Sequence, residues 1–197
     1  MRTAELLCKR ADLWKVADMM KDWDESLFHH SLTVADLTCE VARRLGCDEK
    51  QIEHLQMGAF LHDVGKICWP RYLVSKRNLS PDDVRMIRDH PRYGEAYAEE
   101  YVRNVNPDVL RIIREHHERL DGSGYPDGLK DGAISFLSRI VAAVECFAAL
   151  TEPRQYREKQ FTVEEALRIA ADDGFDPTVL KIIGGLFGKK VAQIASR

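Results

Sequence analysis

The sequence predicts an all-α protein, a helical bundle, on three observations. Apolar residues recur every three or four positions along most of the 197-residue chain, which is the spacing of one face of a helix. No segment alternates apolar and polar residues with the two-residue period that is typical of a strand. Residues that start or stop helices separate the apolar segments from one another. Such a succession of helices buries its apolar faces by packing them together.

The N-terminal part begins with an amphipathic segment from Ala4 to Met20. A chain of this length suits one compact domain with a short additional helix. We therefore predict an N-terminal helical extension over residues 1–22 and one domain over residues 23–197.

Seven helices are predicted in that domain, several of them with recognisable ends. Gly46 follows the apolar face of the first helix and would end it. Ser80 and Pro81 form an N-cap and a first-turn proline for the third. Thr162 and Glu165 form a capping box for the sixth. The segments are 27–45, 52–62, 81–90, 107–117, 134–145, one that opens at Thr162, and one from Asp176 to about Gly188.

Composition excludes some classes of function. The formal net charge is −3, so the chain lacks the basic surface of a protein that binds a nucleic-acid polymer. Five scattered cysteines without a C-x-x-C pair indicate a reducing compartment. No apolar run is long enough to span a bilayer, and the first residues do not form a secretion signal. We therefore expect a cytoplasmic protein with no membrane partner.

Two pairs of adjacent polar residues are hard to explain as core packing: His62-Asp63 and His116-His117. Neighbouring helical side chains point about 100° apart. Both members of a pair reach one centre only near a helix end or across a cluster of metals. Imidazoles with a carboxylate are the ligand set of a divalent transition metal. The longest irregular stretch, Leu120 to Gly132, follows the second pair and is a candidate functional loop.

Three further residues are weaker candidates when each is considered alone. His30 lies on an apolar helix face, where a hydrogen-bonded core histidine is the commoner interpretation. His90 precedes Pro91 and reads as a histidine at the end of a helix. Glu145 interrupts an apolar stripe, and a buried carboxylate needs a partner such as a cation. Metal sites in bundles assemble from facing helices, which favours a shared centre for these residues.

Longer motifs strengthen this interpretation because they occur in a fixed order. They are H-D-x-G-K at His62–Lys66, H-P-x-x-G at His90–Gly94, H-H-E-x-x-D-G-x-G-Y-P at His116–Pro126, F-x-A-L-T at Phe147–Thr151 and R-x-Y-R at Arg154–Arg157. With these motifs the chain resembles the HD-GYP family of metal-dependent phosphohydrolases, from about His30 to Phe187. The resemblance implies a helical bundle around divalent metals, usually iron or manganese, and hydrolysis of cyclic di-GMP to pGpG or GMP.

The resemblance also implies a role for each matching residue. Asp63, which would bridge two metals, and Lys66, near the scissile phosphate, are the expected catalytic residues. Lys66, Arg154, Arg157 and Tyr125 are the expected substrate-binding residues. The expected metal ligands are His30, His62, Asp63, His90, His116, His117 and Glu145.

Three positions depart from the family pattern. Glu145 and Ala148 stand where the family has aspartates, so one ligand is a methylene longer and a hydrogen-bonding carboxylate is lost. Ser26 stands where three-metal members have a glutamate, which favours a site for two divalent transition-metal ions.

Two alternatives to cyclic di-GMP hydrolysis remain open at this stage. One is a phosphohydrolase that acts on another cyclic dinucleotide or nucleotide. The other is a degenerate member that binds cyclic di-GMP, or a protein partner, without turnover. A homodimer or a signalling partner protein is compatible with either alternative.

Overall fold

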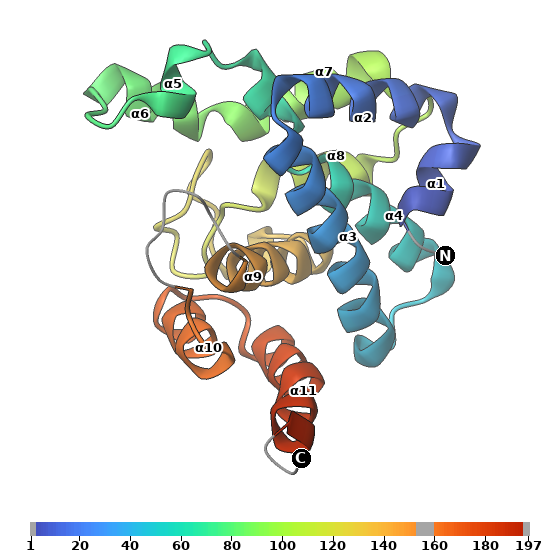
Figure 1. Cartoon of the computed structure of the whole chain (residues 1–197), viewed down its shortest axis with the longest axis vertical. Helices are drawn as coiled ribbons and strands as arrows, with labels where there is room; N and C mark the ends of the chain where they lie inside the picture. Colours follow the sequence, from blue (N-terminus) through green and yellow to red (C-terminus); the bar gives the residue numbers. More distant parts are fainter. Residues whose placement is uncertain (1–2, 153–159, 195–197) are drawn as a thin grey trace.

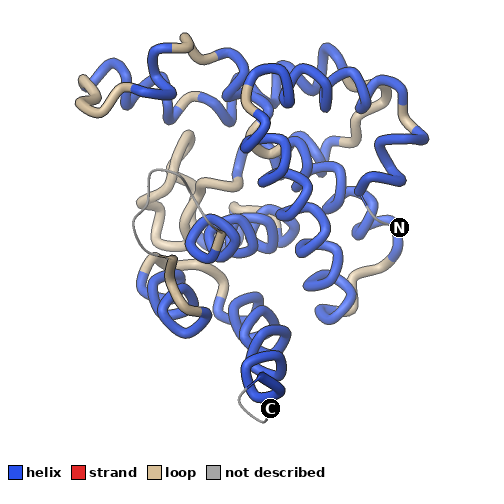
Figure 2. The backbone as a smooth tube through the Cα atoms, viewed as in Figure 1, coloured by secondary structure: helices blue, strands red, loops and turns tan. Residues whose placement is uncertain are grey.

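The computed structural model describes residues 3–152 and 160–194, and all regular secondary structure in these ranges is helical, which confirms the all-α prediction (Figure 2). Two short 3₁₀ helices are η1 (Val64–Cys68) and η2 (Asp131–Ala133). The α-helices are α1 (Thr3–Lys9), α2 (Ala11–Trp23), α3 (Glu25–Leu45), α4 (Glu49–Leu61), α5 (Tyr72–Ser75), α6 (Pro81–Arg88), α7 (His90–Tyr101), α8 (Pro107–Glu115), α9 (Phe136–Thr151), α10 (Val163–Asp172) and α11 (Pro177–Ile194).

The centre of the fold is a bundle of α3, α4, α8 and α9 (Figure 1). Their apolar stripes meet in one core, in which Phe60, Ile112 and Ile140 are completely buried. Helices α2 and α7 lie across one end of the bundle, and α10 and α11 pack against α9 at the other end. Helices α5 and α6 extend beyond the bundle at the α7 end. In the described part of the chain, no helix is both long and apolar enough to cross a membrane.

Local end signals set the helix boundaries where the sequence predicted them. Gly46 ends α3 with a positive φ of 78°, and its N–H bonds the carbonyl oxygens of Ala42 and Arg43. The Thr162–Glu165 capping box opens α10. These contacts lie within a few residues of one another, which is why the sequence alone reveals them.

The predicted segment Ala4 to Met20 is interrupted at Arg10, which has extended backbone between α1 and α2. The Arg10 guanidinium bonds the Asp12 carboxylate and the carbonyl of Arg103, 93 residues away. The apolar side chains of both helices enter the same core as the rest of the bundle.

Three other helix boundaries were predicted wrongly. The helix that opens at Pro81 ends at Arg88, and His90 starts a new helix, α7, instead of ending the previous one. A proline in the first turn is a known start signal, so Pro91 could have revealed α7. Ile134 lies before α9, and the last helix continues to Ile194.

A close contact between η1 and α7 depends on Gly65. A Cβ atom at this position would lie 2.0 Å from the His90 carbonyl oxygen and 2.6 Å from the Gly94 nitrogen. We expect Gly65→Ala to lower the free energy of unfolding by about 3 kcal/mol, because backbone must move to relieve the overlap. Gly185→Ala is the control, since no atom lies within 4 Å of its Cβ position, and it should be neutral or stabilising. Urea denaturation of both variants tests this, and equal stabilities would contradict it.

Candidate metal centre

The His62-Asp63 pair lies where α4 ends. His62 is the C-terminal cap of α4, and Asp63 precedes η1 with backbone angles outside the helical region (φ −101°, ψ 7°). Because the helix stops here, the two adjacent side chains turn toward one centre instead of diverging. Their Nε2 and Oδ2 atoms are 3.2 Å apart, and both side chains are buried.

The other pair and His90 also lie at helix ends. His116 caps the C-terminus of α8, and His117 follows it. His90 is the first residue of α7, which η1 approaches closely at Gly65. The ring of His90 lies 5.3 Å from that of His116 and 5.0 Å from that of His117, measured between centroids.

Two ligand groups share Asp63. The potential ligand atoms of Asp63, His90, His116 and His117 lie within 4.8 Å of one another, and so do those of His30, His62 and Asp63. Asp63 Oδ1 lies 3.1 Å from His90 Nε2 and 3.9 Å from His116 Nε2. The other oxygen, Oδ2, lies 3.2 Å from His62 Nε2. Each carboxylate oxygen therefore faces a different set of imidazoles, which is the arrangement that a bridging carboxylate needs.

Hydrogen bonds orient the imidazoles for metal binding. In His62, His90 and His116, Nδ1 lies 2.7, 2.8 and 2.8 Å from the backbone carbonyl oxygen three residues earlier. An Nδ1–H donated to these carbonyls leaves a lone pair on Nε2, which points into the centre. Among the residues that the structure describes, the buried Nε2 atoms of His30 and His62 find no hydrogen-bond partner. A divalent cation would satisfy both, so the donor set fits the metals that the sequence predicts.

The charges in the centre agree with this assignment. Burial would raise the pKa of Asp63, but Lys66 and His62 outweigh it and hold this pKa well below its usual range. Desolvation and neighbouring imidazoles hold the pKa values of His116 and His117 well below normal. Burial would also lower the pKa of His62, but the attraction of Asp63 outweighs it and raises this pKa. At neutral pH the centre thus combines the Asp63 carboxylate with neutral imidazoles at His116 and His117, which are the protonation states that metal ligands need.

His30 connects the first ligand group to α9. Its Nε2 lies 4.0 Å from Glu145 Oε1, but Glu145 is not in either group of ligand atoms that lie within 4.8 Å of one another. On the opposite side of the ring, Nδ1 lies 2.7 Å from Glu152 Oε2. A carboxylate that accepts the outer N–H of a ligand histidine fixes the ring orientation and makes the other nitrogen more basic. Sequence reasoning missed Glu152, because nothing in the local pattern signals a partner 122 residues away from it.

We expect Glu152→Gln to weaken metal binding at the His30 side by about 10-fold or more, since losses of such outer contacts cost 10- to 100-fold. Glutamine keeps a hydrogen-bond acceptor but not the charge. Titration of Mn²⁺ followed by calorimetry measures the affinity. Glu25→Gln is a matched control, because Glu25 pairs with His29 on an exposed surface at 3.8 Å. Equal loss in both variants would show that Glu152 has no special role.

Lys66 and Tyr125 lie beside the centre, whereas Arg154 and Arg157 lie outside the described residues. Lys66 Nζ is 2.5 Å from Asp63 Oδ2. The ring of Tyr125 stacks on that of His117, with centroids 4.6 Å apart.

The loop that carries Tyr125 is held by Glu118, the glutamate of the H-H-E motif, to which the sequence analysis assigned no role. This buried carboxylate accepts the backbone N–H groups of Asp127, Gly128 and Leu129. Three such bonds fix the loop against the end of α8, and therefore fix Tyr125 against His117.

The departures from the family pattern also have defined places. Ala148 is buried in the apolar core, where it provides no polar group to the centre. Asp24 caps α3, and its carboxylate accepts the backbone N–H and the hydroxyl of Ser26, each at 2.7 Å. Glu25 pairs with His29. Neither Ser26 nor Glu25 contributes to the ligand groups found.

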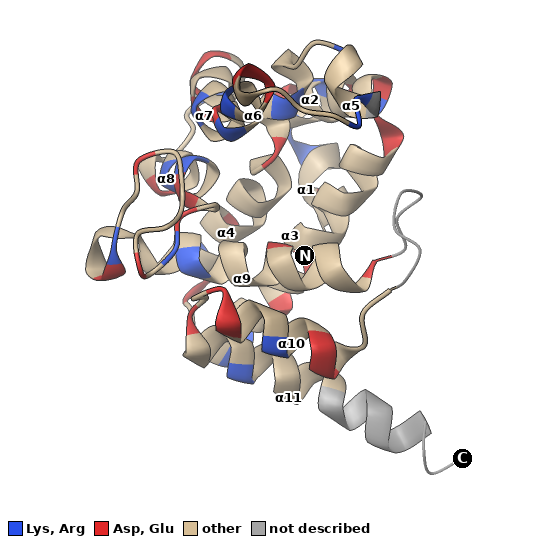
Figure 3. Ribbon diagram, turned by 90° about the vertical axis from the view of Figure 1, so that its left-hand side faces the viewer, with Lys and Arg blue, Asp and Glu red and all other residues tan. Residues whose placement is uncertain are grey.

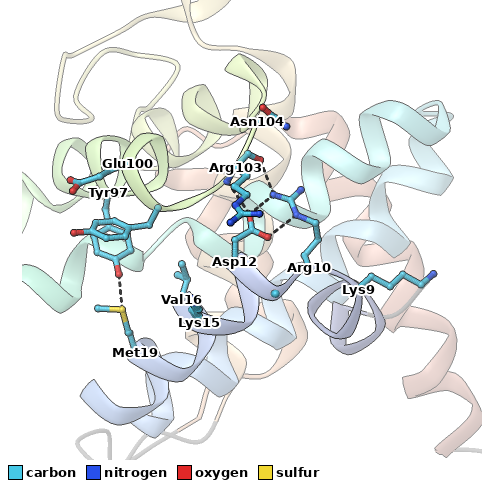
Figure 4. Close-up of a pocket in the computed structure, with 12 residues that line it drawn as sticks. Lys9, Arg10, Asp12, Lys15, Val16, Met19, Tyr97, Glu100, Arg103 and Asn104 are labelled. Atoms are coloured by element: carbon cyan, nitrogen blue, oxygen red, sulfur yellow. Dashed lines mark hydrogen bonds and ion pairs between the residues drawn. The ribbon is translucent and has the colours of Figure 1, made fainter.

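A cavity of 870 Å³ lies between α2 and α7, away from this centre (Figure 4). Its Arg10 is held by Asp12, and its Tyr97 hydroxyl contacts the sulfur of Met19. None of the residues predicted for the site lines it. Because both ligand groups found among the described residues contain Asp63, we assign the chemistry to the centre around it.

Comparison with known proteins agrees with the geometry. Residues 15–179 match the family model of the HD domain. A solved HDG"Y"P protein from Bdellovibrio bacteriovorus superposes with a TM-score of 0.68 at 25% identity, covering 84% of this chain and 53% of that one.

Two curated relatives are similar in sequence. The cyclic di-GMP phosphodiesterase response regulator RpfG of Xanthomonas campestris is 41% identical over 70% of this chain. The 3'3'-cGAMP-specific phosphodiesterase 1 of Vibrio cholerae is 33% identical over 72%. The chain spans only 37% and 33% of the lengths of these two relatives.

Proposed function

Because this chain belongs to the HD domain family and carries the HD-GYP motifs, we propose that it is a metal-dependent phosphodiesterase that hydrolyses cyclic di-GMP to pGpG, GMP or both. The observation that carries this proposal is the placement of Asp63, with one carboxylate oxygen toward each group of imidazoles. Two metals about 3.5–4 Å apart are the common means of activating water against a phosphodiester.

Each residue has a proposed part in this chemistry. His30, His62 and Glu145 would hold one metal, His90, His116 and His117 the other, and Asp63 would bridge them. Bound there, the metals would acidify a water molecule and neutralise phosphate oxygens. Iron or manganese suits imidazoles combined with carboxylates.

Lys66 would stabilise the negative charge that develops on the phosphate. Its ammonium lies within 2.5 Å of Asp63, so a phosphate bound at the bridge would be within its reach. The side chain is one quarter exposed, and a cation at the edge of a buried site can follow the developing charge.

The direct test is incubation of the protein, loaded separately with iron and with manganese, with cyclic di-GMP. Chromatography of the products should show pGpG or GMP. Tight binding of cyclic di-GMP without product, under both metals, would contradict hydrolysis and favour a binding protein.

Specific observations favour the two other candidate functions. The similarity to a 3'3'-cGAMP-specific phosphodiesterase favours a different cyclic dinucleotide as substrate. The loss of a carboxylate at Ala148 and the longer Glu145 favour binding without turnover. Parallel incubations with cyclic di-GMP and 3'3'-cGAMP distinguish the substrates by their rates.

We also propose a cytoplasmic location, which the five free cysteines support. We propose in addition that the protein forms a homodimer or binds a signalling partner protein. Light scattering of the purified chain would reveal a homodimer.

A further inference from the structure

A second cavity of 430 Å³ lies between α6 and the loop that follows His117. Its walls come from one side of α6, from Pro81 to Arg88 and on to Asp89, and from Gly124, Tyr125 and Pro126. Basic and acidic segments lie side by side on α6, α7 and α8 (Figure 3). Arg85 and Arg88 line the cavity itself.

The two arginines differ in their partners. Arg85 is 71% exposed and pairs with the Asp82 carboxylate one turn earlier on α6. Arg88 has no carboxylate partner among the described residues, and Asp89, beside it, pairs with Arg92 instead. The Arg88 guanidinium lies over the face of Tyr125, 5.3 Å from the ring centroid. Such a contact orients the planar guanidinium but leaves its donors available for a ligand.

A stack of three groups connects this cavity to the metal centre. The Arg88 guanidinium lies over the ring of Tyr125. That ring stacks in turn on the imidazole of His117, with 4.6 Å between the ring centroids. His117 belongs to the ligand group around Asp63. Tyr125 therefore lies between the ligand group and Arg88, so a substrate that contacts both Asp63 and Arg88 must pass along the Tyr125 ring.

A cyclic dinucleotide has two phosphates, of which only one is attacked at a time. The other carries a full negative charge and must be accommodated away from the metals. We propose that Arg88 binds this second phosphate and thereby selects dinucleotides over simple phosphodiesters, an inference that rests on the proposed function. An arginine fork matches phosphate oxygens with two parallel hydrogen bonds, which a lysine cannot form.

The test compares two substrates in the metal-loaded protein. For Arg88→Met, we expect the KM for cyclic di-GMP to rise by about 10- to 100-fold, because a charge-assisted bidentate contact is lost. The kcat/KM for bis(p-nitrophenyl) phosphate, which has one phosphate, should change less than about twofold. Metal content should equal that of the wild type. Arg88→Lys should fall between Arg88→Met and the wild type, since it restores charge without the fork.

Arg85→Met is the matched control, because Arg85 lines the same cavity but already has a carboxylate partner. An unchanged KM for cyclic di-GMP in Arg88→Met would overturn the inference while leaving the proposed function intact. Equal losses on both substrates, or equal losses in the Arg85 and Arg88 variants, would overturn it as well. If the wild type cleaves the simple diester but neither binds nor cleaves cyclic di-GMP, the proposed function fails and this inference fails with it.

Discussion

Replacing Asp63 with asparagine is expected to abolish binding of both metals and to lower the rate of phosphodiester hydrolysis by more than about 100-fold. Loss of a residue that only hydrogen-bonds a metal ligand costs up to about 100-fold, and loss of the bridging ligand itself should cost more. Asparagine keeps the volume of the side chain but removes the charge and one of the two oxygens. Each Asp63 oxygen faces a different group of imidazoles, so one substitution disturbs both sites. Elemental analysis after loading with manganese measures the metal content, and the initial rate measures activity.

The chain offers a matched control for this substitution. Asp83 is also buried and pairs with a lysine, Lys76, at 2.5 Å, as Asp63 pairs with Lys66. Asp83→Asn removes a comparable ion pair outside the two ligand groups. It should keep full metal content and activity, whatever it costs in stability. Full metal content in Asp63→Asn, or equal losses in both variants, would contradict a bridging role for Asp63.

Removal of Glu145 should produce the next largest effect. We expect Glu145→Ala to lose about one metal per chain and most of the activity, because its carboxylate is the ligand candidate that α9 contributes beside His30. Glu145→Asp should retain or increase activity, since a shorter carboxylate does not push its metal outward from the bridge. The same metal and rate assays measure both variants. Glu40→Ala, which removes an exposed glutamate paired with Arg44, is the control.

Two results with the Glu145 variants would contradict this expectation. If Glu145→Ala keeps two metals and the full rate, Glu145 is not a ligand. His30, His62 and Asp63 would then have to suffice for the first metal. A loss in Glu145→Asp as large as that in Glu145→Ala would show instead that the longer side chain is required.

Much of the fold was predictable because helix ends depend on residues close in sequence. Gly46 and the capping box at Thr162 are examples, since each acts within one or two turns. The break at Arg10 was not predictable in this way, because its guanidinium bonds a carbonyl 93 residues away. The start of α7 at His90 had a local signal, Pro91, that was interpreted as the end of a helix.

Some residues of the candidate site were likewise predictable from the sequence and others were not. Adjacent polar pairs at helix ends, His62-Asp63 and His116-His117, indicate ligands directly, because both members of a pair can face one centre only there. Glu152 gives no such indication, and Glu118 lies in a quoted motif but its loop contacts could not be read from it. The contacts of these two glutamates depend on which distant segments the fold brings together. A single sequence does not reveal that arrangement.

The central claim is that two metals share the Asp63 carboxylate. Anomalous diffraction from a crystal of the manganese-loaded protein tests it most directly. We predict two peaks about 3.5–4 Å apart, one beside His62 and one beside His90 and His116, with Asp63 between them. A single peak, or peaks that do not contact Asp63, would contradict the claim.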